Sequence, residues 1–368
     1  MNNSDRVLKV FKKEPVDKIV WQPRLEHWYD VNKLSGTLPP KYRDKDLLEI
    51  CDNLGTSPRT YYFYDRTIRC IQNGDVKVET TEDSQNIISV YSTPKGKLRE
   101  VKRKVIRGLA TDAVAPYWTE YMVKGIQDFE ALKYILDNQI FDFDRELYKE
   151  LDARIDGRAA ATVNLPHAPF AKIIIVYMGF ERASLMILKR ENEVWDLIQT
   201  LEENNDKRIA VIKKSPIPIV NFSDNIDQDL FPRPLFTKYL LPYYQKRTHK
   251  LHASGKFCTS HWDGKVKSLL QYARETGLDG LECVTPKPQG DVTLKEIRIA
   301  LGNMVLLDGI PAISFLPWAS DNELEKIATE VLETFSPRLI LGVSDLVPPN
   351  ANIEKIRLVT RIVEKFQP

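Results

Sequence analysis

The sequence predicts an α/β protein, namely a TIM (β/α)8 barrel with a β-rich insertion near its N-terminal part, for three reasons. From about residue 160 onward, short apolar runs alternate with amphipathic stretches, which is typical of repeated βα units. Nearly every run ends in a polar residue, as strands do where a barrel builds its active site. The length of 368 residues suits one large barrel. We therefore expect a single barrel over residues 1–368.

The expected strands are short apolar segments bounded by turn-forming residues. Such segments are typical of the buried strands of a parallel sheet. In chain order they are KIVWQPRL (18–25), AATVNL (160–165), IPIVNFSD (217–224), GKFCTSHWDG (255–264), GLDGLECVTP (277–286), MVLLDGIP (304–311) and RLILGVSD (338–345).

Helix patterns lie between these strands. Apolar residues recur at i, i+3, i+4 and i+7 from Val266 onward, and Gly277 is placed to end that helix. Thr293 and Glu296 have the spacing of a capping box, with Gly302 as the stop.

Residues 56–105 break the βα rhythm. Their segments TYYFYDRTIRCI, VKVETT and NIISVYSTPKGKLREV alternate polar and β-prone residues around Gly and Asn turns. We interpret this stretch as a β-rich insertion over the barrel mouth.

Composition narrows the class of protein. No apolar run approaches the roughly 20 residues that span a bilayer, and the basic start lacks the apolar core of a secretory signal. The net charge of +2 is smaller than expected for a protein with a basic surface that binds nucleic acid. The four cysteines form no CxxC pair. We expect a cytoplasmic protein that binds neither membrane nor nucleic acid.

The polar residues at the strand ends are the candidate site. They are Arg24, His167, Asp224, His261, Glu282, Asp308 and Asp345. His261 and Glu282 end adjacent strands, where a nitrogen and an oxygen ligand can meet at a Zn²⁺ ion, although a strand-end histidine is more often a hydrogen-bonding residue. Asp263 and Asp345 also stand where helix N-caps occur, so capping is the alternative for both.

Strand alternation separates inward from outward side chains. If His261 points into the barrel, Thr259 shares its face and Cys258 faces the helices. Glu282 is expected to point inward because burying a carboxylate among apolar groups is costly, which turns Cys283 outward. Both cysteines are then expected to be small buried packing residues.

Several segments carry a family resemblance. EPVD near the start, HWDG, LECVTPKPQGD, DGIPA and the closing LGVSDLVPPN resemble the uroporphyrinogen decarboxylase superfamily, within it the cobalamin-dependent methyltransferase branch. The likeness covers most of the chain and implies a TIM-type barrel. The true decarboxylase grips its tetrapyrrole with an arginine-rich segment, but here QPRLEHW holds Arg24 alone. Porphyrinogen decarboxylation is therefore disfavoured.

The thiol-methylating branch binds zinc through a His-x-Cys pair and a distant Cys. This chain keeps His261, but it has Asp263 in the place of the paired cysteine and Gly342-Val343-Ser344 near the distant one. Both expected thiolates are missing, so methylation of a thiol is disfavoured.

The resemblance then favours an O-demethylase-like methyltransferase. It would move a methyl group from a small-molecule donor, a methoxylated aromatic, to the Co(I) corrinoid of a partner protein, because this chain shows no DxHxxG corrinoid motif. A zinc ion on His261 and Glu282, or a protonated Asp263 or Asp224, would activate the leaving group. The candidate substrate-binding residues are Arg24, His27, His167 and Asp308, with Trp28, Tyr29 and Tyr177 as aromatic neighbours or core.

Two alternatives stay open. One is a decarboxylase-like lyase acting on a small carboxylated substrate. The other is a barrel that has lost catalysis and serves as a binding subunit. Barrels of this kind often pair, so a homodimer is compatible with each hypothesis.

Overall fold

The computed structural model describes residues 1–104 and 117–368. They form two compact units. The barrel unit comprises Met1–Arg66, Arg145–Asn164 and Pro216–Pro368, and the second unit comprises the described residues of Thr67–Asp144 and Leu165–Ser215.

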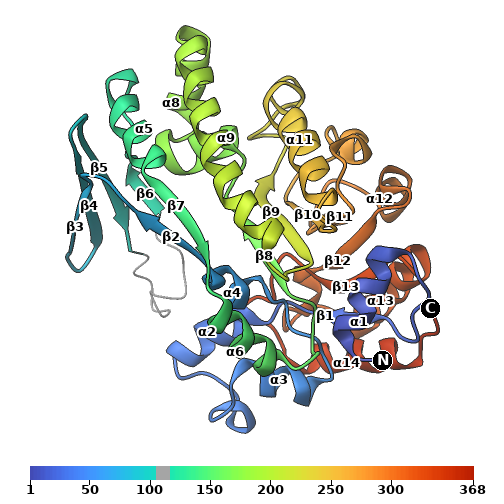
Figure 1. The fold of residues 1–368 in the computed structure, drawn as a ribbon. Helices are drawn as coiled ribbons and strands as arrows, with labels where there is room; N and C mark the ends of the chain where they lie inside the picture. Colours follow the sequence, from blue (N-terminus) through green and yellow to red (C-terminus); the bar gives the residue numbers. More distant parts are fainter. Residues whose placement is uncertain (105–116) are drawn as a thin grey trace. The chain divides into compact units, whose positions relative to one another are not determined.

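A curled, mostly parallel sheet organises the barrel unit (Figure 1). Its strand order is β1-β13-β12-β11-β10-β9-β8. The bounds are β1 (Val20–Gln22), β8 (Thr162–Leu165), β9 (Ile219–Ile226), β10 (Phe257–Trp262), β11 (Gly280–Glu282), β12 (Val305–Pro311) and β13 (Leu339–Ser344). Six of these strands lie within predicted segments, and β9 runs two residues past the end of its segment at Asp224. The predicted α/β barrel class is thereby confirmed as a barrel-like fold of seven strands.

A segment without strand structure connects β1 to the stretch that leads into β8. The amide of Ser57 donates to the carbonyl of Trp21, at 2.8 Å. The Thr60 hydroxyl donates to the carbonyl of Ala160, at 2.7 Å, and accepts from the amide of Thr162, at 3.1 Å. This loop therefore joins the two edges that an eighth strand would join in a closed barrel.

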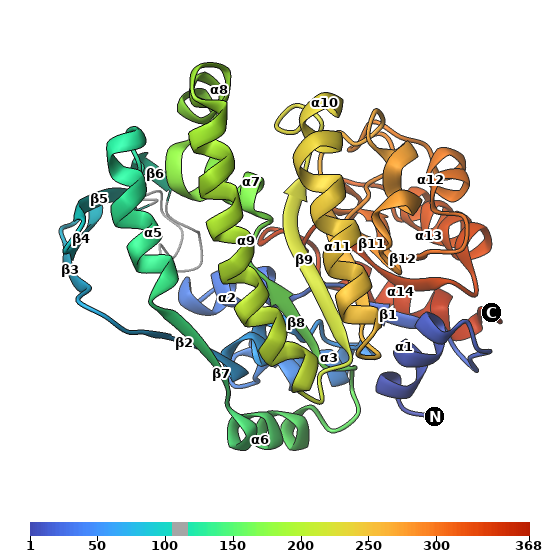
Figure 2. The same cartoon turned by 45° about the horizontal axis from the view of Figure 1, so that its top comes forward.

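Helices surround the sheet, and Figure 2 shows α11, α12 and α13 along its outer side. The longer helices of the barrel unit are α1 (Asn3–Lys12), α2 (Glu26–Leu34), α3 (Leu47–Leu54), α6 (Arg145–Ile155), α11 (Leu241–His252), α12 (Leu294–Leu301), α13 (Asp321–Phe335) and α14 (Glu354–Lys365). The short ones are η1 (Pro40–Tyr42), α4 (Tyr61–Tyr64), η2 (Asp65–Thr67), α10 (Arg233–Leu235), η6 (Phe236–Leu240), η7 (Leu270–Thr276) and η8 (Ala312–Phe315).

The helix signals of the sequence are found with one difference. The Thr293–Glu296 capping box opens α12, and Gly302 follows its end. Gly277 ends η7 in the left-handed conformation, with φ of 77°. The helix expected from Val266 is, however, a 3-10 helix that starts only at Leu270, and the amides of Val266 and Lys267 before it donate to the carboxylate of Asp291.

Helix α1 covers the end of the sheet at which the strands begin. Its residues Val7, Val10 and Phe11 pack in one buried cluster with the first or second residues of strands, namely Val20, Ile219, Val305 and Ile340. The opposite end, where the strands finish, is thus the end available for a site.

The second unit is rich in antiparallel strands. β2 (Ile68–Gln72) pairs with β7 (Gln139–Phe143), and a four-stranded sheet has the order β3 (Lys77–Glu82), β4 (Asn86–Thr93), β5 (Gly96–Arg103), β6 (Tyr117–Glu120). Its helices are η4 (Ile126–Asp128), α5 (Phe129–Asp137), α7 (Pro169–Lys172), η5 (Ile173–Met178), α8 (Phe180–Lys189) and α9 (Glu191–Lys214).

The β-rich stretch predicted over residues 56–105 divides between the two units. Its part up to Arg66 belongs to the barrel unit, where Tyr61–Tyr64 is helical although aromatic residues favour strands. The strands begin at Ile68, and residue 105 lies outside the described residues. Within residues 1–104 and 117–368, no helix has the length and apolar character needed to cross a membrane.

Replacing Thr60 tests the loop that joins β1 to β8. Thr60→Val removes the donor that lies closest to the Ala160 carbonyl and the acceptor of the Thr162 amide, so we expect a loss of about 1–3 kcal/mol in the free energy of unfolding. Thr60→Ser keeps the hydroxyl and should stay close to wild type. Urea unfolding measures both variants, and equal stabilities would contradict this role of the loop.

The last residue of α11 supplies a pH test. His252 Nε2 lies 2.8 Å from the Asp279 carboxylate, and this hydrogen bond raises the pKa of His252 above its usual value. Protonated His252 therefore stabilises the fold below the unfolded pKa of about 6.5, and the contribution is lost as pH rises through the folded pKa.

His252→Asn should accordingly lower stability at pH 5.5 and change it little at pH 9. Because the side chain is 40% exposed, we expect a loss of less than about 1 kcal/mol. His249→Asn, the same exchange at an exposed position of α11, is the control. Urea unfolding across this pH range checks the difference, and a pH-independent effect would refute the ion pair.

Candidate active site at the strand ends

A polar cavity of about 230 Å³ opens where the strands of the barrel unit end. Its lining comes from several strands and from α4, which brings residues far apart in sequence together. The lining residues are Arg24, Tyr61, Tyr62, Asn164, Asn221, Ser223, Asn225, His261, Asp263, Glu282, Asp345 and Leu346.

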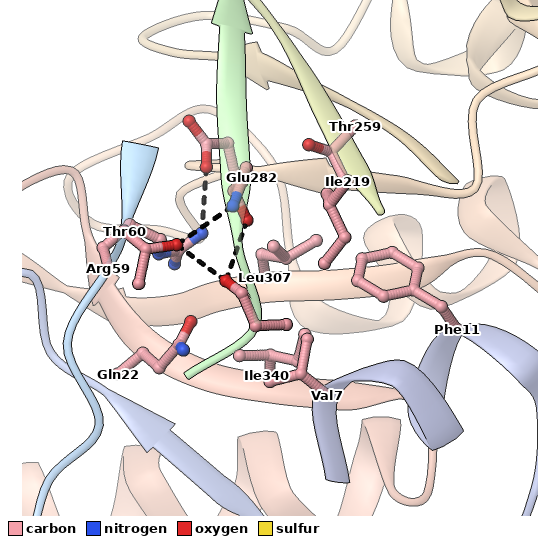
Figure 3. Close-up of a pocket in the computed structure, with 12 residues that line it drawn as sticks. Val7, Phe11, Gln22, Arg59, Thr60, Ile219, Thr259, Glu282, Leu307 and Ile340 are labelled. Atoms are coloured by element: carbon pink, nitrogen blue, oxygen red, sulfur yellow. Dashed lines mark hydrogen bonds and ion pairs between the residues drawn. The ribbon is translucent and has the colours of Figure 1, made fainter. Parts of the chain in front are cut away.

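Arg59 holds two buried carboxylates, those of Glu282 and Asp308, and Figure 3 shows its contact with Glu282. Its Nη1 lies 2.9 Å from Glu282 Oε2, and its Nη2 lies 2.5 Å from Asp308 Oδ1. All three side chains are at most 4% exposed. Buried carboxylates are tolerated only with such partners, so Arg59 is what permits Glu282 and Asp308 at the centre of the barrel.

Sequence reasoning missed Arg59, because it stands in a loop and belongs to no strand pattern. The sequence pointed to a buried cation such as Arg59 only indirectly. Two strand-end carboxylates, Glu282 and Asp308, were expected inside the barrel, and each needs a cation.

Arg24 is the second cation of the site. Its Nη1 lies 3.0 Å from Asp345 Oδ1 and 3.9 Å from Asp308 Oδ2. Arg24, Cys283 and Asp308 have φ values of 53°, 69° and 81°, in the left-handed region that side chains avoid. Such strained residues gather at functional sites, where the surrounding structure holds them in place.

The two central carboxyl groups differ in acidity. Burial raises the pKa of Asp308 to about 6, against the lowering effect of Arg59 and Arg24. Burial would also raise the pKa of Glu282, but the hydrogen bond with His261 and the positive charges of Arg24 and Arg59 hold it well below its usual value. Glu282 is therefore a carboxylate at neutral pH.

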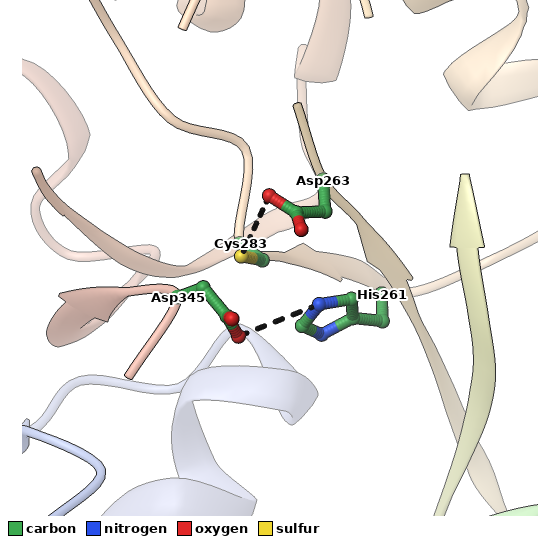
Figure 4. A group of neighbouring side chains, drawn as sticks. All are labelled: His261, Asp263, Cys283 and Asp345. Carbon is green, nitrogen blue, oxygen red and sulfur yellow. Dashed lines mark hydrogen bonds and ion pairs between the residues drawn. The ribbon is translucent and has the colours of Figure 1, made fainter. Parts of the chain in front are cut away.

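His261 points into the barrel, as strand alternation predicts. Its Nδ1 lies 2.8 Å from Glu282 Oε1, and its Nε2 lies 3.6 Å from Asp345 Oδ1. Nε2 is thus the nitrogen turned toward the acidic group at the mouth (Figure 4).

Four side chains at the mouth could hold a metal ion. One ligand atom each from His261, Asp263, Cys283 and Asp345 lies within 4.8 Å of all the others. Nitrogen, carboxylate oxygen and sulfur are the donors that zinc prefers, and four of them suit its tetrahedral geometry. Glu282 was expected as a ligand, but its oxygens already accept from Arg59, Asn221 and His261.

Cys283 corrects the sequence prediction. It was expected to face the helices as a packing residue, yet its Sγ lies 3.7 Å from Asp263 Oδ1 in the mouth group. Alternation fails here because β11 ends at Glu282 and the positive φ of Cys283 turns the chain. Cys283, the residue after β11, therefore brings a thiol to the site. The two positions at which the family resemblance leads one to expect cysteines, Asp263 and the segment 342–344, carry none. Cys258, by contrast, is fully buried as predicted.

Asp263 and Asp345 lie at the mouth and are not the N-caps of the helices η7 and α14 that follow them, whose N-caps are Leu269 and Ile353. Asp263 Oδ1 accepts from the amide of Gly264, at 2.6 Å, and so stabilises a turn while it faces Cys283. Asp345 pairs with Arg24 and lies beside His261.

The remaining candidates lie elsewhere. Asp224 is fully buried and accepts a hydrogen bond from Tyr244 of α11, at 2.6 Å. It faces the helices because its neighbours Ser223 and Asn225 take the cavity side of β9. His27 is partly buried on α2 and is not among the residues that line the cavity. His167 belongs to the second unit, where its carbonyl accepts from Asn205.

The aromatic neighbours are core residues. Trp28 and Tyr29 of α2 are 2% and 7% exposed, and Trp28 packs edge-on against Tyr42. Tyr177 is buried in the second unit. Two tyrosines that were not predicted, Tyr61 and Tyr62 of α4, line the cavity instead.

The fold and the site define an α/β barrel with charged side chains at its strand ends, among them a group that could hold a metal ion. Residues 109–366 match the family model described as uroporphyrinogen decarboxylase (URO-D). The chain belongs to the uroporphyrinogen decarboxylase family.

Comparison with known proteins adds likeness in fold. A solved structure of a methyltransferase from Methanosarcina mazei has a TM-score of 0.63 and 13% sequence identity, covering 100% of this chain and 99% of that one. A putative vitamin-B12 independent methionine synthase from Listeria monocytogenes has a TM-score of 0.43 and 11% identity, covering 95% and 96%. No curated protein sequence matched the chain.

Removing Arg59 tests the charge compensation at the centre of the barrel. Arg59→Met leaves the buried Glu282 and Asp308 without the cation that lies closest to both, so we expect a loss of about 3–5 kcal/mol in the free energy of unfolding. Adding Asp308→Asn removes one uncompensated charge and should restore part of that loss. Chemical denaturation of both variants checks this, and a double variant no more stable than Arg59→Met would contradict it.

Proposed function

We propose that the protein is a methyltransferase that moves a methyl group from a methoxylated aromatic donor to the Co(I) corrinoid of a separate partner protein. The observation that carries the proposal is the group of His261, Asp263, Cys283 and Asp345 at the mouth of a barrel of this family. The Methanosarcina mazei protein of similar fold is described as a methyltransferase, which is in keeping with it.

Zinc is the metal that we propose for this group, because the donor atoms include nitrogen, oxygen and sulfur. When bound, it would supply a Lewis acid that stabilises negative charge on the departing oxygen of the donor. The two arginines of the site face more carboxylates than they can neutralise, so the mouth carries an excess of negative charge that a divalent cation would offset.

The side chains around the group have roles of their own. His261 would offer Nε2, since its Nδ1 is hydrogen-bonded to Glu282. Glu282 would orient the ring, as carboxylates do for metal-binding histidines in other proteins. Arg24 would hold Asp345 in place through their 3.0 Å ion pair.

The cavity sets the size and character of the donor. About 150 Å³ is enough for benzene, so about 230 Å³ admits one substituted ring and is too small for a tetrapyrrole. Tyr61 and Tyr62 offer aromatic surface, while Ser223 and Asn225 offer polar groups. This combination suits a ring that carries hydroxyl or methoxy substituents.

The corrinoid would come from a partner, because this chain contains no DxHxxG motif. The cofactor would supply the nucleophile, and the barrel would bind the donor and activate its leaving group.

Two measurements test the proposal. Elemental analysis of the purified protein should find zinc, and incubation with a reduced corrinoid protein should remove methyl from a methoxylated aromatic compound. His261→Ala should lose the metal. It should also lower demethylation by more than about 10–100-fold, which is the usual effect of removing only a hydrogen-bond partner of a metal ligand. His249→Ala, on the exposed face of α11, is the matched control and should change neither.

The alternatives predict other outcomes. Release of CO2 from a small carboxylated compound, without metal or corrinoid, would favour a decarboxylase-like lyase. Absence of zinc, together with full demethylation by His261→Ala, would refute the metal site. Binding of ligands without either reaction would favour a non-catalytic subunit.

A further inference from the structure

A ladder of hydrogen bonds crosses the barrel interior and ends at His261. Asn164 Nδ2 donates to Asp65 Oδ2, at 3.0 Å, and Asn221 Nδ2 donates to Asn164 Oδ1, also at 3.0 Å. The same Nδ2 of Asn221 donates to Glu282 Oε1, at 3.2 Å, and that oxygen lies 2.8 Å from His261 Nδ1.

The carboxylates at the two ends set the direction of every bond in this ladder. Asp65 accepts from the amide and the side chain of Asn164, so the side-chain oxygen of Asn164 is left to accept from Asn221. Asn221 uses both hydrogens of its Nδ2 as donors, and its Oδ1 accepts from the Thr259 hydroxyl, at 2.9 Å. A flipped Asn221 would turn an oxygen toward both Asn164 Oδ1 and Glu282, and would lose two bonds.

Burial makes this arrangement rigid. Asn221, Thr259 and Glu282 are at most 2% exposed, so water does not compete for their hydrogen bonds. β9 and β10 place Asn221 and Thr259 directly opposite each other in register, and β10 and β11 do the same for His261 and Glu282. The ladder therefore connects side chains that the sheet already holds in place.

We infer that Asn221 is a positioning residue: it holds Glu282 as the acceptor for His261, which fixes the imidazole proton on Nδ1 and turns the lone pair of Nε2 toward the cavity. Glu282 has only acceptor atoms when ionised, so a hydrogen bond between it and Nδ1 requires a proton on Nδ1. Nε2 is then the nitrogen free to bind a metal ion or to accept a proton, whatever reaction the site carries out.

The tautomer of His261 can be observed directly by nitrogen NMR. The full-length protein, labelled with ¹⁵N at its five histidines, freed of metal by chelation and held at a pH at which the His261 imidazole is neutral, should show a protonated Nδ1 and a bare Nε2 for His261. The signal is assigned by its loss in His261→Ala. A bare Nδ1 with a protonated Nε2 in the wild-type protein would overturn the inference, without reference to any variant.

Asn221→Asp tests the positioning residue itself. It keeps the shape of the side chain but replaces two donors by acceptors, so the ladder should break and the Nδ1-protonated pattern of His261 should be lost. Asn225→Asp adds the same charge to the same strand, at an exposed position outside the ladder, and should keep the pattern. Thr259→Val removes the bond to Asn221 Oδ1 but leaves both donors, and should keep it as well.

If Asn221→Asp shows the same His261 pattern as the wild-type protein, the role of Asn221 is overturned. It is also overturned if Asn225→Asp loses the pattern as fully as Asn221→Asp does. If Asn221→Asp does not fold, Asn221→Ala removes the same two donors without adding a charge and is read in the same way. A merely structural role of Asn221 would lower stability without moving the proton between the two nitrogens.

Discussion

The buried contact of Arg59 with Glu282 and Asp308 is the interaction on which the mouth of the barrel depends. Two carboxylates at the centre of a sheet are costly to bury. The guanidinium group offsets that cost because its Nη1 contacts Glu282 and its Nη2 contacts Asp308. Arg59 stands in the loop that joins β1 to the approach to β8, through Ser57 and Thr60. The same segment thus completes the barrel and supplies the charge that its interior needs.

Glu282 links this structural core to the chemistry above it. Its Oε2 accepts from Arg59, and its Oε1 accepts from Asn221 and from His261. Below Glu282 the interactions serve stability, and above it His261 joins three acidic or thiol side chains at a distance that suits a metal ion. The strained backbones of Arg24, Cys283 and Asp308 surround this boundary.

Much of the fold could be predicted from the sequence, because buried parallel strands are read as short apolar runs. Each of the seven strands of the barrel sheet starts in a predicted segment, only β9 runs past the end of its segment, and the Thr293 capping box opens its helix. The loop with Arg59 and the short helix α4 were missed. Loops have no periodic pattern, and the aromatic residues of α4 favour strands in isolation. Asp224 was predicted at the mouth but faces α11, since alternation along β9 assigns the cavity side to its neighbours.

The sequence by itself determined the class of fold, the positions of the strands and the inward orientation of His261 and Glu282, because these depend on local periodicity and on the cost of burying charge. Only the tertiary structure decided which groups meet. Cys283 joins the mouth group because its positive φ turns it there, and Glu282 is held by Arg59, which is 223 residues away in the chain. Contacts of that kind arise from packing between distant segments, which no local pattern records.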